Sequence, residues 1–366
     1  MRSAGSAKRF RSFLVNGVLA IIVFLWLVPV VGLLVSSFRQ RFDIVTTPWW
    51  SVFPHRDWVP TKTINPRELG LDPSGLMTVE GITATFKELR AGIEEGNTRL
   101  IWIGTRPIGK IEVQERQWVT TANLSVDNYR QVVLGRSVLI ENADGTVETV
   151  RGDDFSGALI NSLTVAIPAT VIPILIAAFA AYGFAWMRFS GRGVLFAIVV
   201  ALLVVPLQIA LVPVLRDFAA LNLNGTLLGI WLAHTGFGLP LAIFLLYGYI
   251  RSIPREILES AFIDGASHFT VFNRLVLPLS VPSLAAFAIF QFLWVWNDYL
   301  VALVILGPDP NTRVVTMKLA GMVGTYGQDW HLLTAGAFMS MAIPLLVFFS
   351  LQRYFVRGLM AGSVKG

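Results

Sequence analysis

Six long apolar stretches constrain the fold of this chain more than any other feature. Each is long enough to cross a bilayer as a helix, which takes about 20 apolar residues. The stretches cover residues 14–35, 158–187, 194–215, 226–250, 281–306 and 332–355. The chain is 54% hydrophobic and only 14% charged, whereas a soluble domain carries about a quarter charged residues. The sequence therefore predicts an all-α polytopic membrane protein with six transmembrane helices.

The placement of basic residues predicts how these helices are oriented. Arg and Lys cluster before the first helix and after the second, fourth and sixth, whereas the loops on the other side hold fewer. Because cytoplasmic loops are rich in Lys and Arg, both termini are expected in the cytoplasm, with the chain in a bacterial-type inner membrane. This asymmetry accounts for the net charge of +6 without a nucleic-acid partner. The first apolar run is longer than the 7–15 residues or so of a signal peptide, so an uncleaved anchor is preferred.

One polar segment, 39–157, interrupts the pattern on the outer side. Its runs 78–86 and 110–116 alternate apolar and polar residues, as half-buried strands do. The run 138–150 carries Asp144-Gly145 in its middle, which is typical of a hairpin turn. We therefore expect a strand-rich extracytoplasmic insertion between helices 1 and 2. The predicted divisions are 1–38, 39–157, the helical core 158–356 and a tail, 357–366.

The sequence contains few motifs that are typical of enzymes. Gly104–Ile111 (GTRPIGKI) nearly matches a phosphate-binding P-loop, but Ile111 stands where the magnesium-binding Ser or Thr is required. A turn between strands is the preferred interpretation. The four histidines, His55, His234, His268 and His331, lack metal-ligand spacing, and the chain has no cysteine. No catalytic residue, bound metal or cofactor of its own is expected.

A charged interruption, 251–282, lies between the fourth and fifth apolar stretches. Pro254 suits the first turn of a helix, in which Ile257, Leu258, Ala261 and Phe262 form an apolar stripe. Gly265 is suited to a left-handed helix end, and Ser267 to the cap of a second short helix that Pro278 would stop. The stripe could pack on lipid or on the chain's own spans, or it could enter a partner's groove. The residues alone leave these alternatives open.

The same segment resembles the EAA loop of binding-protein-dependent ABC importer permeases of the carbohydrate (maltose-type) family. The resemblance is carried by Glu259-Ser260-Ala261, Asp264-Gly265-Ala266 and Leu277-Pro278, with Ser260 standing where the family usually has Ala. It implies that this cytoplasmic coupling loop docks into an ATPase subunit. It gives Glu259 an ion-pair or helix-capping role and makes Gly265 the turn between two helices.

Two further stretches support the resemblance. The end of the chain, RGLMAGSVKG, is similar to the carboxyl end of the sugar permeases, which implies ATPase contacts through Gly362, Ser363, Lys365 and Gly366. Trp296-Asn297-Asp298-Tyr299 stands in the fifth span where sugar permeases often carry Trp-Asn-Glu. An Asp at the centre of a membrane helix should face protein or water. Asn297 and Asp298 would line a solute pathway or make helix–helix hydrogen bonds, and the second interpretation is preferred.

Further pathway candidates are Gln208, Gln291 and Trp294, each of which packing could equally explain. The large outer insertion makes the chain most like the α-glucoside permease subgroup. The expected function is therefore the permease subunit of an ATP-driven importer for an oligosaccharide such as an α-glucoside. The resemblance implies an ABC ATPase dimer that holds ATP and Mg, a second homologous permease chain and a solute-binding protein. An ion-coupled secondary transporter and a membrane-embedded enzyme are the alternatives, although no repeat between halves and no cluster of carboxylates or histidines supports them.

Overall fold

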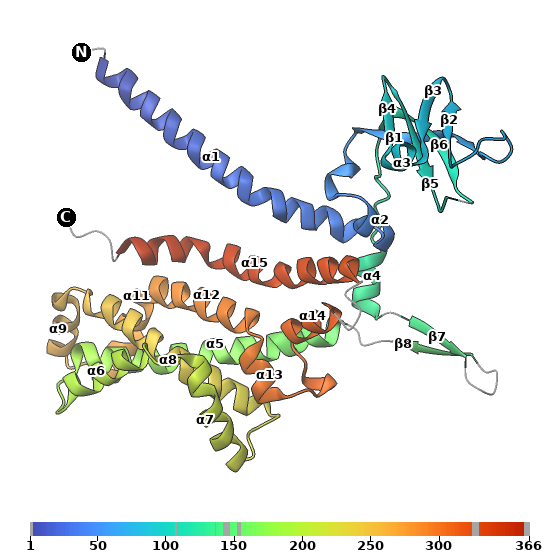
Figure 1. Ribbon diagram of the computed structural model, residues 1–366. Helices are drawn as coiled ribbons and strands as arrows, with labels where there is room; N and C mark the ends of the chain where they lie inside the picture. Colours follow the sequence, from blue (N-terminus) through green and yellow to red (C-terminus); the bar gives the residue numbers. More distant parts are fainter. Residues whose placement is uncertain are drawn as a thin grey trace. The chain divides into compact units, whose positions relative to one another are not determined.

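A computed structural model describes residues 3–106, 108–135, 137–141, 147–151, 155–323 and 329–361. Side chains are described in these ranges except for 3–8, 137–141, 147–151 and 355–361. The chain divides into two compact units, Met1–Ser125 and Val126–Gly366 (Figure 1). The tail residues Gly362 to Gly366, and the turn expected at Asp144-Gly145, lie outside the described residues.

The first unit joins one long helix to a small sheet. Its elements are α1 (Ser3–Phe38), α2 (Arg41–Thr46), the 3-10 turn η1 (Trp49–Val52), β1 (His55–Ile64), β2 (Leu76–Val79), β3 (Ile82–Thr85), α3 (Phe86–Ala91), β4 (Ile93–Glu95), β5 (Thr98–Ile103) and β6 (Lys110–Val119). Four antiparallel strands form a sheet in the order β1-β6-β5-β4. Ile64, Leu100, Trp102 and Ile111 of this sheet share a buried core with Met77 of the separate β2–β3 hairpin and Leu89 of α3.

The prediction of one strand over 78–86 is wrong in one respect, because this segment contains a tight turn between two strands. β2 and β3 pair as a hairpin with Val79 opposite Ile82. The two turn residues, Glu80 and Gly81, both have positive φ, at +52° and +84°, which is the geometry that two-residue hairpins favour. The strands expected at 110–116 and 138–150 are present as β6 and as the pair β7 (Ser137–Glu141) and β8 (Val147–Arg151). β6 begins at Lys110 inside the P-loop-like stretch, as expected for a turn between strands.

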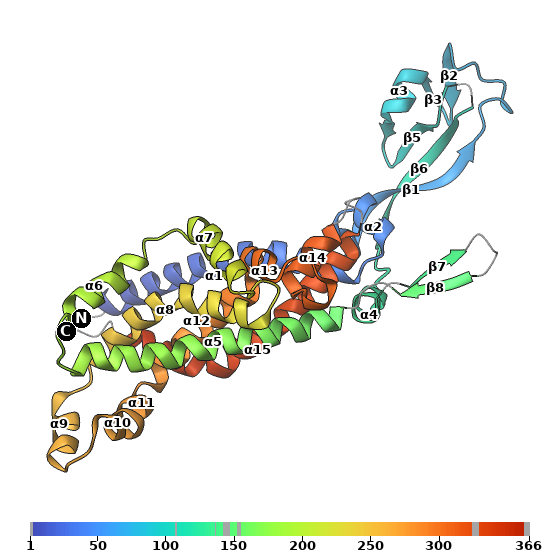
Figure 2. The same cartoon turned by 90° about the horizontal axis from the view of Figure 1, so that it is seen from below.

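The second unit is almost entirely helical (Figure 2). Besides β7 and β8 it contains α4 (Asp127–Leu134), α5 (Phe155–Trp186), α6 (Arg192–Leu202), α7 (Leu207–Ala220), α8 (Leu227–Arg251), α9 (Arg255–Ile263), α10 (His268–Val271), the π-helical turn η2 (Phe272–Val276), α11 (Leu277–Leu279), α12 (Val281–Asn297), α13 (Leu300–Leu306), the 3-10 turn η3 (Pro310–Thr312), α14 (Val315–Val323) and α15 (Trp330–Ala361). α4 lies in the segment expected as insertion, and its Val132 belongs to a core cluster of the helical unit.

Four helices of the described chain are long and apolar enough to cross a membrane, or up to six spans if each bent helix pair counts as one. The third expected span is not one straight helix, since α6 and α7 meet at 105°. Just before Pro206, three successive residues donate their N–H to the carbonyl three positions earlier, as in a 3-10 helix. The last of these bonds runs from Val205 N–H to Leu202 O. A residue preceding proline disfavours the helical conformation, so the Val205-Pro206 step breaks the span. The fifth expected span also breaks, between Asn297 of α12 and Leu300 of α13.

Two apolar cores hold the helical unit together. The core at one end joins α5, α8, α12, α13, α14 and α15 around residues such as Phe155, Ile230 and Phe292. The core at the other end joins α5 and α8 to the α9–η2 segment through Leu246, Leu258 and Val271. The charged interruption of the sequence is thus packed onto one end of the bundle.

Candidate coupling segment and membrane core

The segment between α8 and α12 forms two short helices with a glycine turn. α9 follows Pro254, and the turn after it is closed by hydrogen bonds from Gly265 N–H to Phe262 O and from Ala266 N–H to Ala261 O. Gly265 has φ +80°, a conformation that costs a residue with a β-carbon about 1 kcal/mol or more. Ser267 then caps α10 by accepting a hydrogen bond from Thr270 N–H at 3.2 Å. The expected pair of helices joined at Gly265 is present.

The apolar residues of this segment face in two directions. Leu258 is fully buried in the bundle core, with Ala261 and Phe262 packed beside it, so this part of the expected stripe packs on the chain's own helices. Ile263 and Phe269 point outward, with 86% and 66% of their surfaces exposed, and Ile257 is 40% exposed. The segment therefore has an inner face that packs on the bundle and a separate, exposed apolar face beside the turn.

Aromatic contacts tie α10 to α5. The Tyr182 hydroxyl lies 2.8 Å from His268 Nδ1, and the Tyr182 ring packs on Phe272 with ring centroids 5.5 Å apart. Phe262 of α9 contacts the same histidine ring edge-on, at 4.8 Å. These contacts link the α9–α10 segment to α5.

Two expected details of the segment are wrong. Pro278 does not stop the second helix, because α10 widens into the π-helical turn η2 and α11 continues to Leu279. The bend, of 71°, falls only where α12 begins. Glu259 lies in the middle of α9 and is exposed, so it caps neither helix end. Its ion-pair role stays a prediction.

A buried polar network joins three helices inside the bundle. Gln291 of α12, 3% exposed, donates through Nε2 to Ala169 O of α5 at 3.1 Å and to His234 O of α8 at 3.4 Å. His234 is fully buried, with Nδ1 3.1 Å from Ile230 O and its ring edge-on to Trp294 at 5.2 Å. These contacts make Gln291 a helix-joining residue, and they add His234 to the site.

Asp298 stands at the break between α12 and α13, not within a continuous helix. Its carboxylate accepts hydrogen bonds from Val301 N–H and Ala302 N–H, at 3.4 and 3.0 Å, and so caps the start of α13. Oδ2 also lies 3.6 Å from His234 Nε2, and the Asp298 carbonyl accepts from Thr316 Oγ1 of α14 at 2.6 Å. Asp298 therefore connects α8, α13 and α14, as the preferred helix–helix interpretation expects.

The remaining pathway candidates are not part of this network. Asn297 is exposed and donates to Leu293 O of its own helix at 2.7 Å, so the preferred helix–helix interpretation is wrong for this residue. Gln208 is exposed on α7. Sequence reasoning missed His234 and Thr316, because neither has a motif and their partners lie 64 and 18 positions away along the chain.

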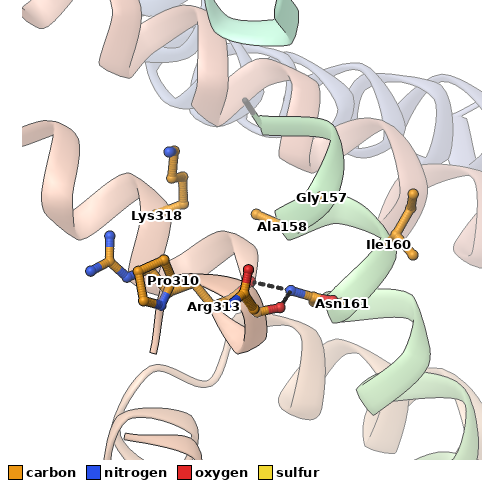
Figure 3. A pocket seen from close by; sticks show the side chains of 8 residues that line it. Gly157, Ala158, Ile160, Asn161, Pro310, Arg313 and Lys318 are labelled. Atoms are coloured by element: carbon orange, nitrogen blue, oxygen red, sulfur yellow. Dashed lines mark hydrogen bonds between the residues drawn. The ribbon is translucent and has the colours of Figure 1, made fainter. Parts of the chain in front are cut away.

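A cavity of about 290 Å³ lies at the start of α5 (Figure 3). This is the end of the bundle opposite the coupling segment (Figure 1). Asn161 forms one wall and donates through Nδ2 to the carbonyls of Asn311 and Arg313, at 2.7 and 3.1 Å. Next to it, Ser162 Oγ accepts a hydrogen bond from Val315 N–H at 2.8 Å. The start of α5 thereby fixes the loop between α13 and α14, with Arg313 and Lys318 lining the cavity.

A helical membrane bundle with a two-helix segment between two of its spans is the architecture expected of the permease component of a transport system. Residues 160–360 match the family model "Binding-protein-dependent transport system inner membrane component". The chain belongs to this family, which makes it the multi-pass inner-membrane component of an ABC importer that works with a binding protein and an ATPase. Family membership decides against the ion-coupled and enzymatic alternatives.

Two relatives are similar over nearly the whole chain. The osmoprotective compounds uptake permease protein GgtD of Synechocystis is 45% identical, over 94% of this chain and 89% of its own. The alpha-glucoside transport system permease protein AglG of Rhizobium meliloti is 42% identical, over 94% and 95%. A crystal structure of a bacterial ABC transporter that imports alginate shares the fold, with a TM-score of 0.59 at 15% identity, over 95% of this chain and 98% of that one. The expected likeness to α-glucoside permeases is confirmed.

Proposed function

We propose that the chain imports a neutral α-glucoside or a related glycosylated osmolyte. The support is its similarity over nearly full length to an alpha-glucoside permease and to an osmoprotectant permease. Gln208 and Asn297, both exposed, are the remaining candidates for contact with the hydroxyl groups of the solute.

In the proposed assembly an ABC ATPase dimer holds ATP and Mg²⁺, and a second homologous permease chain completes the pathway. The coupling segment and both termini lie in the cytoplasm, with Glu259, Ser260, Asp264 and the tail from Gly362 facing the ATPase. One observation carries this proposal most directly. α9 and α10 bury Leu258 and Val271 in the bundle while Ile263 and Phe269 stay exposed. An apolar, helical outer face of this kind fits the groove of a partner.

ATP-driven closure of the ATPase would move α9 and α10 together. The Tyr182–His268 contact would transfer the movement to α5, and the near-continuous helical path through η2 and α11 would transfer it to α12. Binding of nucleotide can shift the bundle between states only if it favours one of them, and this segment supplies the physical link.

Substitution at Gly265 tests the coupling. Gly265→Val should leave the complex assembled and ATP hydrolysis present, while ATP-dependent uptake into proteoliposomes falls strongly, because a β-branched side chain resists positive φ. Gly265→Asn is the matched control, since Asn adopts this conformation most readily of the residues with a side chain. Normal uptake in the valine variant would refute the proposed role of the turn.

The solute class is tested by competition. A neutral α-glucoside such as trehalose should compete for uptake in cells that depend on this permease, and a zwitterionic osmolyte such as glycine betaine should not. The reverse result would overturn the proposed solute class while leaving the coupling proposal intact.

A further inference from the structure

Exposed aromatic and aliphatic side chains gather where α1 ends. The five residues Phe42, Val45, Trp50, Phe53 and Trp118 are 54–74% exposed, and we call them the collar. They come from α2, from η1 and its flank, and from β6. Phe42 and Val45 are three residues apart on α2 and share one helix face. Two exposed arginines lie near Trp118 of the collar. Arg56 stacks over the Trp118 ring at 5.5 Å, and Arg116, two residues before Trp118 on β6, stacks over Trp58 at 5.9 Å.

The collar is held rigidly against α1. The Arg39 side chain is 1% exposed and donates to Asp43 O at 2.8 Å and to Thr47 O at 3.2 Å, so α2 follows α1 without a free hinge. Thr121 N–H donates to Ser51 O at 2.9 Å, and Thr120 Oγ1 donates to Val52 O at 2.8 Å. These bonds fasten the end of β6 to η1.

The depth of η1 along α1 is set by Trp49. A β-carbon on Gly32 would lie 2.8 Å from Trp49 Nε1, so the indole rests directly on that glycine. Gly32 lies six residues before the end of α1 at Phe38, or about 9 Å along the helix axis at 1.5 Å per residue. η1 therefore folds back alongside the last turns of α1 rather than continuing away from them.

We propose that the collar is a membrane-interface anchor that rests in the headgroup region of the bilayer around the exit of α1. α1 is a candidate span over Arg9–Phe38 with an almost wholly exposed apolar surface, and the collar residues lie beside the last turns of α1 and just after its end. Trp is enriched at such interfaces because its ring is apolar and its N–H is polar. Arg56 and Arg116 fit lipid phosphates by charge. The anchor fixes the height of the β1–β6 sheet above the membrane.

The absence of cysteine makes the test direct. A nitroxide spin label is attached to one cysteine at a time, in the variants Phe42→Cys, Val45→Cys and Phe53→Cys. Each labelled complex is reconstituted into nanodiscs of phosphatidylcholine and phosphatidylglycerol. Collisions with oxygen, which concentrates in lipid, are compared with collisions with a water-soluble nickel chelate. The control is Leu76→Cys, which is 72% exposed on β2, far from α2 across the sheet (Figures 1 and 2).

The proposal expects an oxygen-to-nickel collision ratio several-fold higher at the three collar positions than at Leu76. Ratios equal to the control would place the collar in water and overturn it. Low collision with both reagents would show that protein covers the collar, from this chain or another, and would overturn it as well. Because only labelled positions are compared, the result does not depend on the transported solute.

Discussion

Gln291 joins three helices with one carboxamide, and Gly238 makes room for it. The Gln291 amide donates to carbonyls of α5 and α8. A β-carbon on Gly238 would lie 2.5 Å from Gln291 Oε1, so only glycine allows this approach. Buried polar groups that keep their partners specify one arrangement of a core. At the scale of single residues, this contact fixes how α5, α8 and α12 are packed.

Gly238→Ala should therefore destabilise the bundle by about 1–3 kcal/mol through overpacking, measured as a lower midpoint of thermal unfolding in detergent. Gly236→Ala is the matched control on the same helix, because nothing lies within 4 Å of its added carbon. That variant should be neutral or slightly stabilising. Equal midpoints for the two variants would contradict the role assigned to Gly238.

Asp298 is a second residue whose role can be measured alone. Asp298→Ala removes the cap of α13 and the contact with His234, and should cost about 1 kcal/mol or more. Asp298→Asn keeps one acceptor oxygen and should cost less. Asp217→Ala, at an exposed position of α7, is the control. If the alanine variant at 298 unfolds like wild type, the carboxylate does not hold the helix break in place.

At the scale of elements, the capping box of α3 predicts a pH dependence. Glu88 accepts hydrogen bonds from the Thr85 N–H and hydroxyl, both at 2.8 Å, and the first of these is the main cause of its lowered pKa. A carboxyl with a lowered pKa stabilises the fold above its unfolded pKa, and this stability is lost as the pH falls through the folded value. Amide exchange in α3, corrected for the intrinsic rate, should thus rise in acid.

Glu88→Gln should remove most of this acid dependence in the full complex, because a neutral amide does not titrate. Glu95→Gln, an exposed carboxyl on β4, should leave it in place. Acid sensitivity that persists in Glu88→Gln would assign it to another group.

The sequence predicts some elements well and others poorly, for physical reasons. Hydropathy located the spans because the free energy of transfer into the membrane is a sum over many residues. For example, α8 begins at Leu227 after its Thr226 cap, within a residue of the expected start. Breaks depend on single residues instead. The α6–α7 bend at Pro206 and the α12–α13 break at Asp298 leave the apolar run uninterrupted, so a window average misses them. The His234–Asp298 contact could not be foreseen, because the fold alone brings α8 and α12 together.

At the scale of the whole molecule, the strand-rich sheet is attached through two adjacent strand ends. His55 and Val119 are directly paired at the base of the β1–β6 ribbon, so their Cα atoms are about 5 Å apart. The helical unit Val126–Gly366 has its own cores. The sheet can therefore be removed without stretching the chain.

Replacing residues 56–118 by a short Gly-Ser link should leave membrane insertion and assembly with the ATPase unchanged, since the link closes a gap that is already narrow. Uptake driven by the solute-binding protein should fall if that protein docks on the sheet. Co-purification of the ATPase and proteoliposome uptake measure the two outcomes separately. Failure of the shortened chain to insert would contradict the independence of the helical unit.

The pairing of His55 with Val119 also has an evolutionary consequence. A segment whose two ends meet can be gained, lost or exchanged while the rest of the chain keeps its course. Selection can then change the sheet while the helical unit, which has its own cores, stays under its own constraints. Two parts of one gene would thus diverge at different rates and still be inherited together.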